Sequence, residues 1–312
     1  GKSFAVDFSP IAITTSDNFS GSNQSFVVTD NQTGEDGDNV TLRVRIAHIQ
    51  PPSVGNIQID FSLSDSTEAS FSKTSSNNST SLSFDKNSWD KSQTLYIYGV
   101  DDDIDDDNKS YLLSWDISFG TNPIWNFTGS DDSANRQLSF INLDNDKAGF
   151  SLAVTDNSTS ESGGTGTVTL KLLTLPFITG TDSTSRKNGT GATVKMEVIV
   201  DNTSEAKIDS ISGSKTKTLT FTSSSWDSPQ TVTLFGQDTD DFDEGVIGET
   251  EDYLSGIYHV SAGLAEVDSS IRDVKYNAGS LDNQTVTLWN TDNDTAGVVF
   301  ASIDNNSKES GD

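Results

Sequence analysis

The 312-residue chain contains no cysteine. Disulfide bonds, thiolate metal sites and cysteine nucleophiles are therefore excluded. No run of apolar residues is long enough to cross a membrane as a helix, so we expect no direct membrane insertion. Histidine is scarce as well, and the two histidines, His48 and His259, have no neighbours at the spacing of metal ligands.

Positive charge is in short supply. The sequence has 19 Lys and Arg against 47 Asp and Glu, which gives a formal net charge of −28. This balance excludes nucleic acid and anionic membrane surfaces as direct partners, because both would be repelled. It favours cations instead.

The motifs of common enzyme classes are also missing. There is no Gly-x-Ser-x-Gly elbow, no phosphate-binding loop and no His-Glu-x-x-His sequence. Paired carboxylates could serve glycoside hydrolysis, but no aromatic sugar platform is evident around them. We therefore expect no enzymatic activity, and a carbohydrate-binding module is disfavoured for the same reason.

The sequence does contain an internal duplication. The segment Thr94–Asp103 recurs as Thr231–Asp241, and Asp144–Phe150 recurs 148 residues later as Asp292–Val298. In each copy an alternating apolar segment runs into an acidic loop. A repeat of this kind indicates one structural unit present twice.

The apolar residues alternate with the period of a β-strand. Val40–Ile46, Val168–Leu172 and Thr285–Trp289 all alternate with period two and are rich in Val, Thr and Ile. Clusters of Gly, Asn, Asp and Ser separate such segments, and no helical pattern exceeds about two turns. The sequence predicts an all-β fold of tandem antiparallel, immunoglobulin-like β-sandwiches.

The duplication places the expected domain boundaries. We predict a first sandwich over residues 26–147 and a second over residues 148–295. Residues 1–25 resemble the closing strand of a preceding unit or a partner strand. Residues 296–312 repeat an opening strand, either of a following unit or exchanged with another chain, because an isolated apolar strand cannot satisfy its backbone alone.

Three motifs of the second unit resemble the Calx-β module. They are ESGGTGTVTLKL at Glu161–Leu172, the long segment Leu219–Glu244, and TVTLWNTDND at Thr285–Asp294. This module occurs in the regulatory region of sodium–calcium exchangers and as tandem repeats in large bacterial and archaeal surface adhesins. The resemblance implies sandwiches of about seven strands, with Ca²⁺ held at one tip.

The acidic residues fall at matched positions of the two units, where strands end. Ca²⁺ takes six to eight oxygen ligands in flexible geometry, so carboxylates from several loops suit it. The resemblance assigns ligand positions to the following residues, with Ile104 donating its backbone carbonyl: Glu35, Asp65, Asp101, Asp102, Ile104, Asp106, Asp144 and Asp146 in the first unit, Glu161, Asp201, Asp238, Asp240, Asp241, Glu244, Asp292 and Asp294 in the second, and Glu309 in the segment that follows. Two positions depart from the pattern, because Thr239 stands opposite Asp102 and Lys109 replaces an acid of the family.

Asparagine gives a further indication. The sequence contains 14 Asn-x-Ser/Thr sequons, which mark surface loops of exported proteins that carry N-linked glycans. We expect a calcium-rigidified extracellular structural or adhesion segment of a cell-surface protein, in contact head-to-tail with neighbouring repeats or identical subunits. One alternative is a self-assembling S-layer, sheath or filament subunit joined by strand exchange. Another is a calcium-sensing regulatory module.

Overall fold

The computed structural model describes residues 11–14, 30–46, 55–118, 137–177, 192–239, 255–265, 273, 275–276, 281–294 and 298. The regular structure in these residues is β-strand, so the all-β prediction is confirmed. No helix of the described part is long and apolar enough to cross a membrane. The strands form four sheets in two sandwich-like units.

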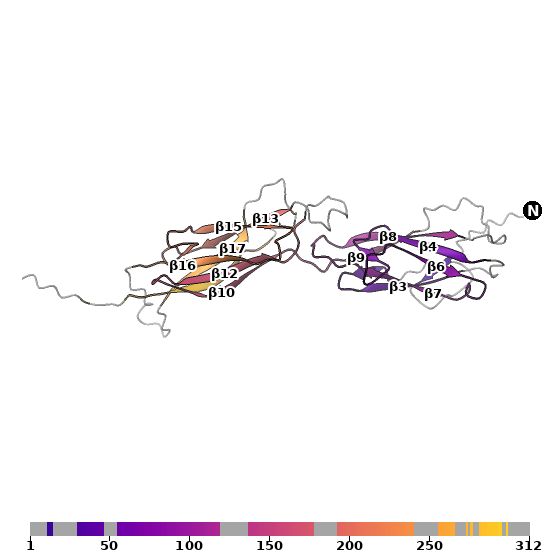
Figure 1. Cartoon of the computed structure of the whole chain (residues 1–312), viewed down its shortest axis with the longest axis horizontal. Coiled ribbons are helices and arrows are strands. Elements are labelled where there is room, and N and C mark those ends of the chain that lie inside the picture. Colours follow the sequence, from indigo (N-terminus) through magenta and orange to yellow (C-terminus); the bar gives the residue numbers. More distant parts are fainter. Residues whose placement is uncertain are drawn as a thin grey trace, which may run out of the picture. The chain divides into compact units, whose positions relative to one another are not determined.

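The first unit pairs a four-stranded sheet, β1-β3-β7-β5, with a five-stranded sheet, β2-β9-β8-β4-β6. Figure 1 shows β4 and β8 in one layer and β3 and β7 in the other. The strands are β1 (Ile11–Thr14), β2 (Gln32–Gly34), β3 (Asn39–Ile46), β4 (Ile57–Leu63), β5 (Ala69–Ser70), β6 (Ser79–Phe84), β7 (Gln93–Gly99), β8 (Lys109–Ser118) and β9 (Gln137–Leu143).

The second unit repeats this arrangement. Its four-stranded sheet has the order β10-β12-β16-β14, and its five-stranded sheet the order β11-β18-β17-β13-β15. The strands are β10 (Phe150–Asp156), β11 (Ser158–Ser160), β12 (Thr165–Leu172), β13 (Thr193–Val200), β14 (Ala206–Ile208), β15 (Thr216–Thr222), β16 (Gln230–Gly236), β17 (Ser255–Leu264) and β18 (Gln284–Thr291).

Alternation along the strands builds the core of each unit. In β4 the side chains at positions 57, 59, 61 and 63 are buried, while those between them are exposed. In β3 every second residue, from Val40 to Ile46, is buried in the same way. Successive side chains of a strand point to opposite faces, so each sheet turns one apolar face inward. The second unit follows the same rule, with Val194, Met196 and Val198 of β13 in its core.

A short parallel strand pair positions the acidic residues in each unit. β2 runs parallel to β9, with Gly34 opposite Leu143. β11 runs parallel to β18, with Ser160 opposite Thr291. Parallel strands end at the same edge of a sheet, so the residues that follow both strands come together there.

The chain divides into two compact units, and each unit is made of two separate stretches of the sequence. The first comprises Gly1–Ala148 and Thr174–Ala192, and the second Gly149–Leu173 and Thr193–Asp312. The described residues 174–177 follow β12 and were expected in the second sandwich. They fall in the first unit, where the Leu175 N–H donates to the Asp103 carbonyl at 2.7 Å.

The strand β1 also has a place that the sequence did not indicate. It pairs antiparallel with β3, from Ile11 opposite Ile46 to Thr14 opposite Arg43. β10 pairs with β12 in the same way in the second unit. The sequence suggested a closing strand of a preceding unit or a partner strand, whereas the pairing makes β1 an edge strand of the first unit. Residues 299–312 lie outside the described residues.

Candidate metal sites

Three carboxylates meet at one end of the first unit. Glu35 follows β2 directly, and Asp144 and Asp146 follow β9. The Glu35 N–H donates to the Leu143 carbonyl at 3.2 Å, which continues the parallel pairing by one residue. The three residues can each offer an oxygen within 4.8 Å of the other two.

The second unit has the same cluster. Glu161 follows β11, and Asp292 and Asp294 follow β18. The Glu161 N–H donates to the Thr291 carbonyl at 3.1 Å. These three carboxylates can also bring oxygens within 4.8 Å of one another.

The backbone holds both clusters by the same hydrogen bonds. The Asn145 N–H donates to Glu35 Oε2 at 3.1 Å, and the Asn293 N–H donates to Glu161 Oε2 at 3.1 Å. In the first unit, Asp144 Oδ1 accepts from the Asp146 N–H at 2.7 Å. In the second, Asp292 Oδ1 accepts from the Asp294 N–H at 2.6 Å. The duplication seen in the sequence is therefore a duplication of geometry.

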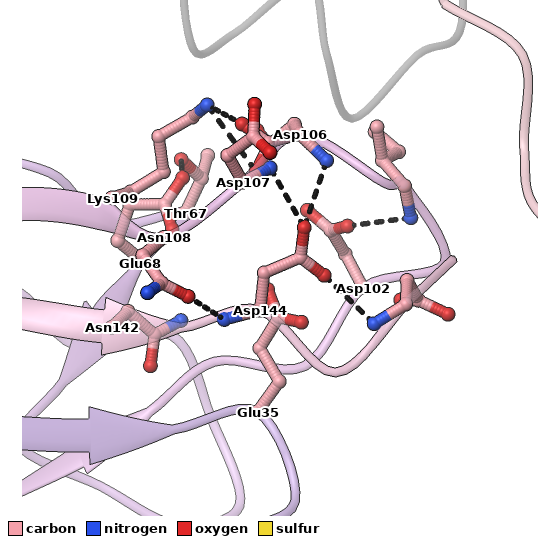
Figure 2. Close-up of polar contacts among 12 residues, drawn as sticks. Glu35, Thr67, Glu68, Asp102, Asp106, Asp107, Asn108, Lys109, Asn142 and Asp144 are labelled. Atoms are coloured by element: carbon pink, nitrogen blue, oxygen red, sulfur yellow. Dashed lines mark hydrogen bonds and ion pairs between the residues drawn. The ribbon is translucent and has the colours of Figure 1, made fainter. Parts of the chain in front are cut away.

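The acidic loop after β7 closes over the first cluster. Figure 2 shows the Asp144 carboxylate facing the backbone of this loop, where Oδ2 accepts from the N–H groups of Asp106 and Asp107 at 3.0 and 2.7 Å. Asp102 Oδ1 accepts from the Ile104 N–H at 2.9 Å. These bonds fix the loop against the end of the closing strand β9.

One cation of the chain lies at the rim of this loop. The Lys109 ammonium contacts the Asp106 carbonyl and lies 3.4 Å from Asp106 Oδ1 (Figure 2). Lys109 stands where the sequence resemblance led us to expect an acid. Its charge partly neutralises Asp106, whose side chain is 3% exposed.

Three ionised carboxylates repel one another in the first cluster when no cation is bound. Glu35 is 4% exposed, and this burial raises its pKa to about 8, with smaller contributions from the charges of Asp102, Asp144 and Asp146. The pKa of Asp146 is raised to about 6, mainly by burial and then by the Asp144 charge. A divalent cation would reverse the cost of bringing these groups together.

The clusters fit a calcium ion. Ca²⁺ lies about 2.3–2.6 Å from its oxygen ligands, so two ligand oxygens lie at most about 5 Å apart. The 4.8 Å limit within each cluster meets this condition. In addition, Asp146 Oδ2 is buried and has no hydrogen-bond partner among the described residues. A buried carboxylate oxygen without a donor is expensive unless a cation is its partner.

Two predicted ligands lie in other surroundings. Asp65 Oδ1 accepts from the N–H and hydroxyl of Thr67 at 2.9 and 2.6 Å, as in an Asx turn. Asp201 accepts from the His259 N–H at 2.7 Å, and its Oδ2 lies 2.8 Å from His259 Nδ1. Neither residue belongs to the three-carboxylate clusters. Both shape a turn or join two strands.

Three of the remaining predicted ligands belong to the described residues, and the others do not. Asp101 is exposed and accepts from the Asn145 side chain at 3.5 Å, and Ile104 is buried. Asp238 is exposed. The following predicted ligands lie outside the described residues: Asp240, Asp241, Glu244 and Glu309.

Thr239 gives the second cluster a different neighbour. Its N–H and hydroxyl donate to Glu161 Oε1 at 3.2 and 3.1 Å. This threonine stands where the first unit has Asp102. The second cluster therefore has a neutral hydrogen-bond donor in place of a carboxylate.

A buried polar network behind the first cluster was not predicted from the sequence. Thr33 Oγ1 donates to Asn142 Oδ1 at 3.0 Å and lies 3.2 Å from the Tyr111 hydroxyl. Asn142 Nδ2 in turn donates to the Val100 carbonyl at 3.2 Å. The network thereby ties the opening segment, the closing strand and the start of the acidic loop together.

The second unit repeats this network with the same residue types. Thr159 Oγ1 donates to Asn290 Oδ1 at 2.9 Å and lies 3.4 Å from the Tyr258 hydroxyl, and Asn290 Nδ2 donates to the Gln237 carbonyl at 2.9 Å. The signal in the sequence was the recurrence of a threonine, an asparagine and a tyrosine at matched places.

The chain was compared with known proteins. No protein-family model matches it, and no curated protein sequence matches it. Solved structures that resemble it include calcium-binding domain CBD12 of CALX1.1, with 16% identity, a TM-score of 0.33, and coverage of 84% of this chain and 96% of that one. CBD12 from CALX1.2 has 18% identity and a TM-score of 0.26, over 76% of this chain and 79% of that one. The apo-form Calx CBD1 domain has 15% identity and a TM-score of 0.25, over 44% of this chain and 98% of that one. These values are too low to transfer a function, so the metal sites rest on the carboxylate geometry itself.

Proposed function

We propose that this chain is a calcium-binding structural segment of a cell-surface protein. The observation that carries the proposal is the three-carboxylate cluster, which occurs once in each unit with the same backbone hydrogen bonds. A single acidic turn is common on protein surfaces, but two matched clusters of carboxylates from separate strand ends support a shared ligand. That ligand is a hard divalent cation.

The donor set favours Ca²⁺ over other metals. The clusters offer carboxylates, with no histidine or cysteine among them, whereas zinc prefers nitrogen and sulfur ligands. Mg²⁺ needs a strict octahedron and gives up its water reluctantly. Carboxylates contributed by separate segments suit the flexible coordination of Ca²⁺ better.

The positions of the ligands indicate what calcium would do. When bound, Ca²⁺ would supply two positive charges to the cluster. Glu35 would hold the opening segment of the first unit, and Asp144 and Asp146 would hold the end of its closing strand. Glu161, with Asp292 and Asp294, would do the same in the second unit. Each unit would thus be fastened where its short parallel strand, β2 or β11, and its last strand end.

An extracellular location at the cell surface is part of the proposal. The strongly acidic composition supports it, because acidic domains stay hydrated in a calcium-rich exterior. The sequons also support it: the asparagines of seven of them are exposed, namely Asn31, Asn77, Asn78, Asn108, Asn157, Asn283 and Asn293. Exposure is what N-linked glycosylation requires.

The test measures calcium binding and stability together. Calorimetric titration should show binding to the wild type, and Ca²⁺ should raise the melting temperature relative to EDTA at matched ionic strength. Binding to the native state alone contributes about 2.7 kcal/mol at a hundredfold excess over Kd. The double variant Glu35→Gln/Asp146→Asn should lose calcium binding by the first unit. The double variant Glu161→Gln/Asp294→Asn should lose calcium binding by the second unit.

Matched controls separate the clusters from the general acidity. Asp60→Asn on β4 and the exposed Asp227→Asn remove the same charge outside the clusters and should leave the calcium titration unchanged. An identical melting temperature in Ca²⁺ and EDTA, or equal losses from the control variants, would contradict a specific calcium site.

A further inference from the structure

A pocket of about 430 Å³ opens on the first unit beside the carboxylate cluster. It lies between the turn that follows β2, the loop that follows β5, and the end of β7. Glu35 and Asp101 form part of its wall, so it adjoins the candidate calcium site. The rest of its lining contains none of the cluster carboxylates.

Hydroxyl groups form one wall of this pocket. Ser70 organises the loop from within: its hydroxyl donates to the Ser75 carbonyl at 2.8 Å and accepts from the Asn77 and Ser72 N–H groups at 2.9 and 3.1 Å. With Ser70 buried in this role, residues 72–76 of the loop line the pocket, whereas Phe71 packs against the core. They include Ser72, Thr74 and two further serines.

Two tyrosines stand on the same outward face of β7. Tyr98 lines the pocket, and Tyr96 lies next to it with ring centroids 6.2 Å apart and an interplanar angle of 23°. Tyr96 is 46% exposed, because the alternation along β7 turns it away from the core. The two rings are stacked, and together they expose apolar carbon and polar hydroxyl ends at the edge of the pocket, which Tyr98 lines.

The charges of the pocket limit what it can accept. Asp36 and Asp101 are exposed carboxylates at its wall, Glu35 lies deeper, and Lys73 is the basic residue of the lining. An anionic ligand would meet more negative than positive charge. A neutral ligand with many hydroxyls can accept from the lysine and the serines and donate to the carboxylates.

We propose that this pocket binds a neutral sugar residue of a glycan, which packs on the Tyr96–Tyr98 surface and bonds its hydroxyls to the surrounding serines, Lys73 and Asp36. This goes beyond the calcium-binding role, reverses the expectation from the sequence that no aromatic sugar platform is present, and would make the first unit the glycan-contacting half of the chain. A concave site with an aromatic wall and a few convergent polar groups is the usual form of a small-ligand site.

The second unit provides an internal comparison. In the first unit, Tyr96 lies opposite Thr41 and Tyr98 opposite Asn39. The same register in the second unit places Thr233 opposite Thr167 and Phe235 opposite Thr165. The second unit thus carries Thr233 and Phe235 where the first has Tyr96 and Tyr98. The tyrosine surface belongs to one copy of the duplicated fold and is not required by the fold itself.

The experiment is affinity electrophoresis of the whole chain through gels containing mannan, galactan or dextran, with hyaluronan as the acidic comparison and a neutral glycan array alongside. We expect retention by at least one neutral glycan. Tyr96→Thr with Tyr98→Phe, which copies the residues of the second unit, should weaken that retention about tenfold, as expected for the loss of one good contact. Ser72→Ala with Lys73→Ala should also weaken it.

Controls place the site and separate it from calcium binding. Trp289→Ala removes an exposed aromatic ring of the second unit and should leave retention unchanged. The tyrosine variant should keep the wild-type calcium titration and melting temperature, so its effect cannot come from unfolding or from a lost ion. The gels are run in calcium and in EDTA to show whether sugar binding needs the ion.

Several results would overturn the proposal. No retention by any neutral glycan on the gels or the array would do so, as would retention only by hyaluronan, equal retention of the tyrosine variant, or loss of retention in Trp289→Ala. A failed calcium titration with intact tyrosine-dependent retention would instead overturn the calcium proposal and leave this one standing.

Discussion

At the first cluster, the protonation state of Glu35 decides how calcium binding varies with pH. Its pKa is raised from 4.5 to about 8 by burial, so in the ion-free native state the carboxyl holds a proton below about pH 8. The unfolded chain loses that proton near its ordinary pKa. Between these values the native state binds more protons, and the ion-free stability of the first unit falls as pH rises.

Calcium binding should therefore release a proton at about neutral pH, and the calcium affinity of the first unit should rise with pH up to about 8. Calorimetry in two buffers with different ionisation enthalpies counts the released protons. Glu35→Gln should abolish the release from the first unit, whereas Asp60→Asn should not alter it. A wild type that binds calcium without proton release would show that Glu35 is already ionised or does not take part.

Acidic residues at strand ends predicted the three carboxylates of each cluster. They did not predict which other acidic residues would lie apart from the clusters. Glu35 and Asp144 could be found because carboxylates recur where alternating segments stop. Asp65 and Asp201 satisfied the same rule, yet the structure gives them local partners in Thr67 and His259. An aspartate that shapes a turn and one that meets a cation look alike until their neighbours are known.

At the scale of the elements, the long strands could be predicted and the short ones could not. Eight residues such as Asn39–Ile46 show the period of two clearly. The three-residue strands β2 and β11 are too short for a period, and their parallel pairing is set by partners more than a hundred residues away. The placement of β1 beside β3 was missed for the same reason.

A close approach of backbones locks these short strands in place. A Cβ atom added at Gly99, the last residue of β7, would lie 2.3 Å from the Gly34 carbonyl and 2.5 Å from Asn142 Oδ1. At Gly236 it would lie 2.3 Å from the Ser160 carbonyl. Both glycines let the segment before the cluster glutamate pass directly over the neighbouring strand.

Gly99→Ala should therefore displace Glu35 and weaken calcium binding by the first unit, at a cost of about 1–3 kcal/mol in stability. Gly236→Ala should do the same in the second unit through Glu161. Gly166→Ala is the control, because its nearest neighbour would be 3.2 Å away and a small shift can relieve that contact. Chemical denaturation and calcium titration of the three variants provide the measurements. Equal effects from all three would contradict a special role for the close approaches.

At the scale of the whole molecule, the duplication predicted two sandwiches because each copy contains a full set of strands. It could not predict that residues 174–177 group with the first unit, since nothing in a loop sequence states which surface it will contact. The four-residue strand β1 covers only Arg43–Ile46 of β3, whereas β10 pairs along most of β12.

The segment 296–312 gives a prediction about assembly. It repeats the start of the second unit, and we expect it to pair with another repeat or another copy of the chain, head-to-tail. Its deletion should then abolish polymers in calcium while leaving monomers with the wild-type melting temperature. Light scattering and thermal denaturation make the measurement. A destabilised second unit would show instead that the segment belongs to that unit.

The parallel pairing of β2 with β9, and of β11 with β18, has a consequence for tension along the chain. Tension applied between the start of β2 and the end of β9 pulls parallel neighbours past each other. Their hydrogen bonds are then loaded together in shear, rather than opened one at a time as in a peeled hairpin. The carboxylate cluster sits at the end of the same two strands, so a bound ion would resist the same sliding. Single-molecule pulling should show that calcium raises the unfolding force of each unit, and that Glu35→Gln removes the increase from the first unit alone.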